Sequence, residues 1–210
     1  MKILAVSDRV DARLYHPAVH KNMADVALIL SCGDLPPGYL DFLATMLRVP
    51  LFYVAGNHDR PGEAPPPDGS PQPDNGLNLD ERLVSYQGLL IGGLAGSMRY
   101  NRDPGPQYTE REMGRKVARL LPGLLWNRLR HGRYLDILIT HASPRGIHDQ
   151  SDLCHAGFKT FLQFMDRFEP RYLLHGHVHV YGHGAPTETR YGRTTVINVY
   201  PSRLLDIFPL

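Results

Sequence analysis

The sequence predicts an α/β fold built on parallel β-strands, and three features of the chain support this prediction. Short apolar runs at residues 2–7, 26–31 and 51–55 each lead into polar residues. These runs are too short for buried helices and are rich in β-branched or aromatic residues, as buried strands are. Segments with helical spacing at 14–24 and 39–47 separate them. Strands that alternate with helices form parallel β-α-β units.

The remaining elements follow in chain order. Residues 62–78 are rich in Pro, Gly and Asp and predict a long surface loop. Thr109 and Glu112 have the spacing of a capping box, which predicts a helix start, and Pro122 predicts its end. No internal repeat or linker divides the chain, so we expect one domain spanning residues 1–210. Further strands are predicted at 83–86, 89–94, 135–140, 172–175 and 194–199, and further helical stretches at 124–130 and 157–168.

Composition excludes several classes of protein. Apolar residues make up 42% of the 210 residues and charged residues 21%, which indicates a folded globular chain. Lys and Arg (23) exceed Asp and Glu (21) by two, with no long basic run, so nucleic-acid binding is not expected. No apolar stretch approaches the roughly 20 residues of a membrane span, and Met1 leads directly into a predicted strand rather than a signal peptide. Cys32 and Cys154 are too few for a disulfide framework, so we expect a reduced, cytoplasmic protein.

Polar residues follow five predicted strands at the point where each strand ends. In open α/β sheets, ligand sites form beyond the carboxyl ends of the strands, so we expect these residues to converge. Each alone has a plain structural alternative, such as a turn, a helix cap or a half-buried histidine. In order along the chain they are Asp8; Gly33-Asp34; Gly56-Asn57-His58-Asp59; His141; and Gly176-His177-Val178-His179.

The donor types of these residues indicate a metal site. Carboxylate, amide and imidazole ligands without a thiolate suit Mn, Fe, Zn or Mg. The two oxygens of Asp34 allow it to bridge two ions. Two ions about 3.5–4 Å apart can clamp a phosphoryl group and activate water.

In their order and spacing, these motifs resemble those of the calcineurin-like metallophosphoesterase superfamily, which are D-x-H, G-D, G-N-H-[DE], H and G-H-x-H. The match spans about residues 3–200, and the stretch 140–146 (THASPRG) resembles a small-phosphodiesterase branch. The resemblance implies a four-layer αββα sandwich, in which helices flank two mixed β-sheets and a dinuclear metal site lies at one edge.

The resemblance also implies an activity and a role for each residue. The expected reaction is hydrolysis of a phosphodiester or phosphomonoester by in-line attack of a hydroxide that bridges two divalent ions (Mn, Fe, Zn, Ni or Mg). His58 would contact the scissile phosphate and protonate the leaving oxygen, unless it is a purely structural turn residue. The implied ligands are Asn57, His141 and His177 for one ion, Asp8 and His179 for the other, and Asp34 as the catalytic bridge.

The first motif departs from this pattern, because Val10 stands where the family has a histidine. Valine has no lone pair, so one ion lacks a ligand and is expected to bind weakly. Asp11, His16 and His20 are nearby in sequence, but helix position is the simpler explanation of the two histidines. With two dications the site carries net positive charge and attracts a phosphodiester, whereas with one it is negative.

Three arginines and one histidine are further candidates for substrate binding. Arg99 and Arg145 have the guanidinium fork that matches phosphate oxygens, and Arg60 is a third such candidate. The alternative for each arginine is a surface salt bridge. His155 either lines the substrate pocket or helps to start the helix that follows it.

The leading hypothesis is therefore a phosphoesterase that acts on a small-molecule phosphoester or a nucleotide. One alternative is a degenerate scaffold of the same fold that binds a nucleotide or protein partner without turnover; Val10 favours it and the intact His58 opposes it. A nuclease is a weaker alternative, because no extended basic groove is visible in the sequence.

Overall fold

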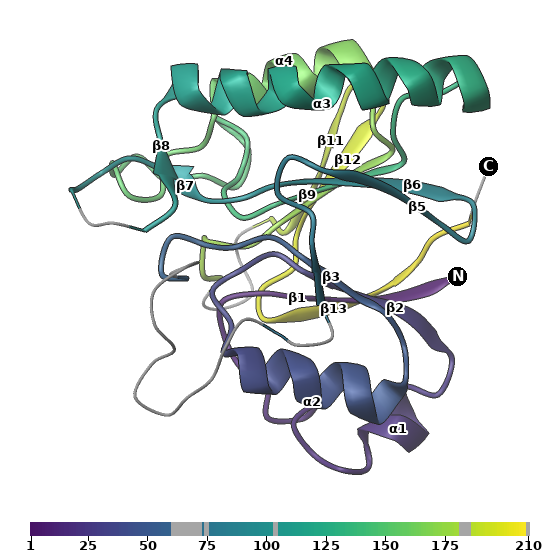
Figure 1. Ribbon diagram of the computed structural model, residues 1–210. Helices are drawn as coiled ribbons and strands as arrows, with labels where there is room; N and C mark the ends of the chain where they lie inside the picture. The colour runs from purple at the N-terminus through teal and green to yellow at the C-terminus, as the bar shows by residue number, and fades with distance from the viewer. Residues whose placement is uncertain (60–72, 74–75, 103–104, 181–185, 209–210) are drawn as a thin grey trace.

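Two β-sheets lie face to face in the computed structural model, with two helices covering the outer face of each (Figure 1). The structure describes residues 1–59, 73, 76–102, 105–180 and 186–208. The expected four-layer αββα sandwich of mixed sheets is confirmed. Most of the predicted loop at 62–78 lies outside the described residues, and so do Arg60 and His183.

The first sheet has five strands in the order β13-β1-β2-β3-β4. The three pairs β1-β2, β2-β3 and β3-β4 are parallel, and β13 runs antiparallel to β1. The parallel strands end at the same edge of the sheet. The bounds are Lys2–Val6 for β1, Val26–Ser31 for β2, Leu51–Tyr53 for β3, Gly76–Asn78 for β4 and Ser202–Asp206 for β13.

The second sheet has six strands in the order β11-β12-β10-β9-β6-β5. Its four central strands are parallel, and the two edge strands are antiparallel to their neighbours. The bounds are Leu83–Tyr86 for β5, Leu89–Leu94 for β6, Ile137–Thr140 for β9, Tyr172–His175 for β10, Glu188–Tyr191 for β11 and Thr194–Asn198 for β12. A separate parallel pair joins β7 (Ser97–Met98) to β8 (Gln107–Tyr108).

Helices cover the outer faces of both sheets (Figure 1). The first sheet is covered by α1 (Val19–Asn22) and α2 (Pro37–Leu47), and the second by α3 (Glu110–His131) and α4 (Lys159–Phe168). The predicted capping box is present at the start of α3, where Thr109 accepts from the Glu112 amide and the Glu112 carboxylate accepts from Thr109.

The strand side chains alternate between two hydrophobic layers. Ile3 of β1 packs between the sheets with Ile91 and Ile139 of the second sheet, whereas Leu4 points to α2 and packs with Leu43. All five are at most 1% exposed. Because each strand is covered on both faces, it is apolar at consecutive positions rather than at alternate ones.

One helix prediction is wrong. Pro122 does not end a helix: α3 continues through it to His131. An internal proline costs about 3 kcal/mol, but Leu120 and Leu124 on either side are buried on the same helix face. Each such side chain contributes about 1.5–3 kcal/mol, so burial outweighs the cost of the proline.

Other differences concern short elements. The helical pattern at 14–24 yields only the four-residue α1, and 76–78, expected in a loop, forms β4. Neither β11 nor β13 is evident in the sequence. The segment Ser202–Asp206 is only partly buried and owes its conformation to long-range pairing with β1.

Candidate metal centre

The polar residues that follow the strands gather at one edge of the two sheets. Asp8, Asp34 and Asn57 follow β1, β2 and β3 of the first sheet, and His141 and His177 follow β9 and β10 of the second. Donor atoms of Asp8, Asp34 and His141 all lie within 4.8 Å of one another. Residues from both sheets therefore meet at one point, as the strand-end pattern predicts.

Two glycines let the backbone approach this point closely. Gly33 has a φ of +95°, and a Cβ there would lie 2.4 Å from the backbone nitrogen of Gly56. A Cβ on Gly56 would lie 2.1 Å from Oδ1 of Asp34. Any larger residue would displace the Asp34 carboxylate, so the Gly-Asp and Gly-Asn-His-Asp sequences follow from the packing of the site.

Asp34 and His141 form the buried core of the site. Nε2 of His141 lies 3.2 Å from Oδ2 of Asp34, and their side chains are 0% (His141) and 8% (Asp34) exposed. Burial opposes ionisation of both groups, but their mutual attraction outweighs it, so the pKa of Asp34 falls to about 2 and the pKa of His141 rises to about 9. With this raised pKa, His141 carries a proton on Nε2 at pH 7, and a cation that binds Nε2 must displace that proton.

The His141 ring and the Asn57 amide are each oriented by a hydrogen bond on the side that faces away from the candidate metal centre. Nδ1 of His141 donates to the carbonyl oxygen of Cys32 at 2.7 Å, and its Nε2 faces Oδ1 of Asn57 at 2.9 Å. The Asn57 amide nitrogen donates to the hydroxyl of Tyr100 at 3.2 Å. Nε2 of His141 is thus turned toward Asp34, and Oδ1 of Asn57 toward the same nitrogen, as outer partners orient metal-binding side chains.

His177 is held by its backbone and by its ring. Its amide donates to both carboxylate oxygens of Asp8, at 3.0 and 2.9 Å, and Nε2 donates to the carbonyl oxygen of Cys154 at 2.8 Å. Burial and the neighbouring His141 lower the pKa of His177 to about 4, so the ring is neutral at pH 7. With the proton on Nε2, the lone pair for a metal is on Nδ1.

His179 lies at the outer rim of the site. Its Nε2 is 3.8 Å from Oδ1 of Asp8, its side chain is 42% exposed, and its ring stacks on Tyr200. Although burial opposes ionisation, the neighbouring imidazoles of His179 and His141 hold the pKa of Asp8 below its ordinary value. Asp8 therefore presents a carboxylate to His179.

The segment that carries His58 is tied to Asp34. The His58 amide donates to Oδ1 of Asp34 at 2.9 Å, while the residue itself is exposed. Oδ2 of Asp59 accepts from the amides of Asp34 and Gly56, at 2.9 and 2.8 Å, which pins the two loops together. The backbone thus fixes His58 beside the site while its ring stays accessible to a substrate.

Val10 packs against the hydrophobic layer under the first sheet, and its side chain has no donor atom that could bind a metal ion together with Asp8. The three polar neighbours do not take its place in the structure. His16 and His20 are exposed and bond within their own turn, to the Ala18 amide and to the Pro17 carbonyl oxygen.

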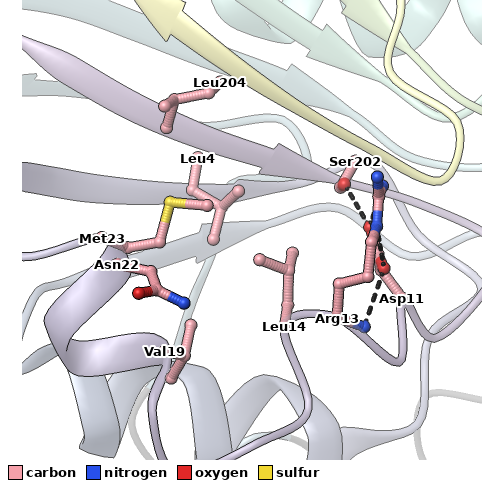
Figure 2. Close-up of a pocket in the computed structure, with 9 residues that line it drawn as sticks. All are labelled: Leu4, Asp11, Arg13, Leu14, Val19, Asn22, Met23, Ser202 and Leu204. Carbon is pink, nitrogen blue, oxygen red and sulfur yellow. Dashed lines mark hydrogen bonds and ion pairs between the residues drawn. The ribbon is translucent and has the colours of Figure 1, made fainter.

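Asp11 is committed to a different network. Figure 2 shows its carboxylate bonded to Arg13 and Ser202, beside an apolar pocket that also includes Leu14 and Leu204. Oδ1 accepts from Nε of Arg13 at 2.9 Å, and Oδ2 accepts from Nη2 of Arg13 and from the Ser202 hydroxyl, both at 2.7 Å. The residue anchors the loop after β1 to β13.

The predicted substrate-binding residues have different surroundings. Arg99 pairs with Glu112 at 3.0 Å, and Arg145 lies 3.8 Å from Asp149, so both take part in surface ion pairs. His155, by contrast, lies beside the site, with its ring 5.1 Å from that of His177 between centroids.

One residue near the centre was not evident in the sequence as a site residue. Tyr100 contacts Asn57 through its hydroxyl, and its side chain also lies near the thiol of Cys154. Tyr100 lies in an irregular loop whose backbone is held by Gln107, which accepts from the Tyr100 amide at 3.1 Å. No local motif marks such a residue, because the loop reaches the site only after folding.

The resemblance divides the candidate ligands into an inner half of the site (Asp34, Asn57, His141 and His177) and an outer half that shares Asp34 and adds Asp8 and His179. The structure brings donor atoms of Asp8, Asp34 and His141 together and places Oδ1 of Asn57 beside His141, whereas Nε2 of His177 bonds the Cys154 carbonyl oxygen. Oxygen and imidazole donors of this kind suit Mn, Fe or Zn.

Comparison with known protein families identifies the family to which this chain belongs. The family model for calcineurin-like phosphoesterases matches residues 1–181. The match covers most of the chain, including all six candidate ligands. The protein therefore belongs to the calcineurin-like phosphoesterase family.

Two individual relatives share limited sequence identity with this chain. The UPF0046 protein K07C11.7 of Caenorhabditis elegans is 27% identical over 218 aligned residues, covering 94% of this chain and 69% of that protein. The crystal structure of TT1561 of Thermus thermophilus superposes with a TM-score of 0.63 at 18% identity, covering 94% and 88% of the two chains. The second likeness is one of fold alone. Among the described residues, no helix combines the length and apolar character needed to cross a bilayer.

Proposed function

We propose that this protein is a metal-dependent phosphoesterase that hydrolyses a small phosphodiester or phosphomonoester. The observation that carries the proposal is the environment of Asp34. One of its oxygens faces Nε2 of His141 at 3.2 Å and the other accepts the His58 amide at 2.9 Å. A single carboxylate thus connects the candidate metal ligands to the candidate general acid.

The chain's residues divide the work between holding cations and handling the substrate. When bound, divalent ions would supply Lewis-acid activation of water and neutralise phosphoryl charge. Asp34, Asn57, His141 and His177 would hold one ion, and Asp8 and His179 would complete a weaker site beside it. The lowered pKa values of Asp8 and Asp34 keep both carboxylates ionised for this role.

His58 would act directly on the substrate. Its backbone is fixed to Asp34 while its ring is exposed, so it can reach a phosphoester without binding metal. In this role it hydrogen-bonds a phosphoryl oxygen and donates a proton to the departing oxygen. His155, beside His177, is the better supported of the other substrate-binding candidates, because Arg99 is paired with Glu112.

Several finer points belong to the same proposal. We expect Mn, Fe, Zn, Ni or Mg as the ion, two ions in the active form, and a nucleotide or other small phosphoester as substrate. We also propose a single domain over residues 1–210 and a cytoplasmic location; the second agrees with the two cysteines being free thiols.

A second candidate function is a non-catalytic scaffold that binds a nucleotide or protein partner. The observation that favours it is Val10, which leaves the outer half of the site one donor short of the family pattern. The retained His58 argues against it, since a scaffold has no use for an exposed general acid tied to Asp34.

Hydrolysis of bis(p-nitrophenyl) phosphate with added Mn²⁺ tests the proposal. The chain should release p-nitrophenol only with metal, and Asp34→Asn should lower the rate at least 100-fold. Asp25→Asn, which changes a surface carboxylate paired with Lys2, is the matched control and should keep the activity. Metal binding without hydrolysis of this or other phosphoesters would favour the scaffold instead.

A further inference from the structure

A second group of metal-ligating side chains lies in the turn before α4, beside the site already described. Asp152, Cys154 and His155 each present one donor atom, and these atoms all lie within 4.8 Å of one another. None of the three belongs to the ligand set at the strand ends. Cys154 and His155 are partly buried and Asp152 is exposed, so the group opens to solvent.

Two of the three side chains, those of Asp152 and His155, already share a proton. Nδ1 of His155 lies 2.9 Å from Oδ1 and 3.0 Å from Oδ2 of Asp152, and the His155 amide donates to Oδ1 at 3.0 Å. A cation bound between an imidazole nitrogen and a carboxylate takes the place of this proton. The Asp152–amide bond holds the turn, so the donors need little rearrangement to meet one ion.

We propose that Asp152, Cys154 and His155 form a separate binding site for a thiophilic divalent cation, of which Zn²⁺ is the physiological example. The thiolate is the distinguishing donor: the ligand set at the strand ends contains oxygen and nitrogen only. Thiolate ligands select Zn²⁺ and similar ions over Mn²⁺ and Mg²⁺. Three protein ligands and an open face leave the fourth position to water.

The proton balance of binding follows from the state of Cys154. Burial raises the pKa of its thiol, so the group is protonated at pH 7. The ion replaces the thiol proton, which leaves to solvent, and the ring proton of His155 moves from Nδ1 to Nε2 so that the Nδ1 lone pair can bind the ion. No electron transfer takes place, and the sulfur of Cys154 keeps its oxidation state when the thiol becomes a thiolate.

The other cysteine does not compete for the ion. Cys32 is fully buried between the sheets and its thiol donates to the Leu174 carbonyl oxygen at 3.5 Å. Burial raises its pKa far above the ordinary value. The chain has two cysteines, so a thiolate–metal signal from the folded protein reports on Cys154.

Cobalt titration of the full chain provides the test, because Co²⁺ replaces Zn²⁺ and gives a near-ultraviolet charge-transfer absorption only when bound to thiolate. The wild type should develop this band to saturation, and added Zn²⁺ should abolish it while Mg²⁺ should not. Cys154→Ser should lose the band. Ser151→Ala, an exposed change in the same turn that removes no donor, should retain it.

The variant Asp34→Asn separates this site from the proposed phosphoesterase centre. It disables the ligand set at the strand ends, so the band should persist in it even if the proposed activity proves wrong. Absence of the band from the wild type, its persistence in Cys154→Ser, or its loss in Asp34→Asn would each overturn the inference. Circular dichroism of every variant establishes that lost signal is not lost fold.

Discussion

The side-chain amide of Asn57 donates to the hydroxyl of Tyr100 at 3.2 Å, although the two residues are 43 positions apart. This bond fixes which end of the amide faces the metal centre, because Oδ1 is then left opposite Nε2 of His141 at 2.9 Å. A loop with no recognisable motif thereby orients a residue of the Gly-Asn-His-Asp motif. Tyr100 is a positioning residue in this account.

Replacing Tyr100 with Phe should weaken Mn²⁺ binding roughly 10- to 100-fold, the usual effect of losing an outer partner of a metal ligand. The ring remains, so the fold should be unchanged. Isothermal titration calorimetry gives the affinity, and Tyr15→Phe, at a residue that is 51% exposed and lies away from the centre, is the control. Equal affinities for Tyr100→Phe and wild type would remove Tyr100 from the site.

Substitution of His58 separates catalysis from metal binding. His58→Ala keeps the backbone amide that bonds to Asp34, so bound metal should be retained, while turnover falls roughly 10²- to 10⁴-fold. The loss should be larger for an alkyl leaving group, which needs a proton, than for p-nitrophenolate, which does not. Metal content by mass spectrometry and kcat for both substrates check this, with exposed His20→Ala as control. Loss of metal in His58→Ala would show that the ring is a ligand.

Val10→His should restore the donor that the outer half of the site lacks. Because wild-type activity is expected to follow occupancy of the weaker site, the variant should reach half-maximal activity at a metal concentration lower by about tenfold or more. Val10→Ala removes the same apolar contacts without adding a nitrogen and should not shift the metal dependence downward. Full wild-type activity at one equivalent of metal would contradict the two-ion account.

The position of the site could be predicted from sequence because it depends on a local rule. Each strand that ends there is a short apolar run followed within about four residues by a polar residue, and parallel strands end at a common edge. Asp8, Asp34 and His141 therefore came together as expected. Tyr100 reaches the centre through a loop whose course depends on a contact with Gln107, which no nearby sequence pattern encodes.

The same contrast applies to the fold. Runs that are apolar at consecutive positions identify the central strands, because both of their faces are covered. The edge strand β13 has no such run and is stabilised by pairing with β1 some 200 residues away, so sequence patterning alone does not reveal it. In α3, burial of Leu124 beyond Pro122 offsets the cost of the proline, and that burial depends on packing that local sequence does not encode.

The carboxylate of Asp11 supplies a pH-dependent contribution to folding at the attachment of β13. Hydrogen bonds from Arg13 lower the pKa of Asp11 to about 2 despite partial burial, and the Ser202 hydroxyl adds to the shift. A folded-state pKa below the unfolded value of about 3.9 means that the ionised form favours the folded chain. The stabilisation is complete above pH of about 4 and is lost as the pH falls through about 2.

Asp11→Asn should therefore lower the free energy of unfolding by about 1–2 kcal/mol at pH 7, after allowance for the solvent exposure of Arg13. Urea unfolding followed by circular dichroism from pH 7 to pH 2 measures the difference from wild type. The difference should narrow below a pH of about 4, because the Asp11 carboxyl of the unfolded wild-type chain then takes up its proton while that of the folded chain stays ionised down to a pH of about 2. Asp25→Asn at the exposed pair with Lys2 should have little effect at any pH. A difference for Asp11→Asn that stays constant with pH would mean that packing beside Leu14, rather than the charge, is what the substitution disturbs.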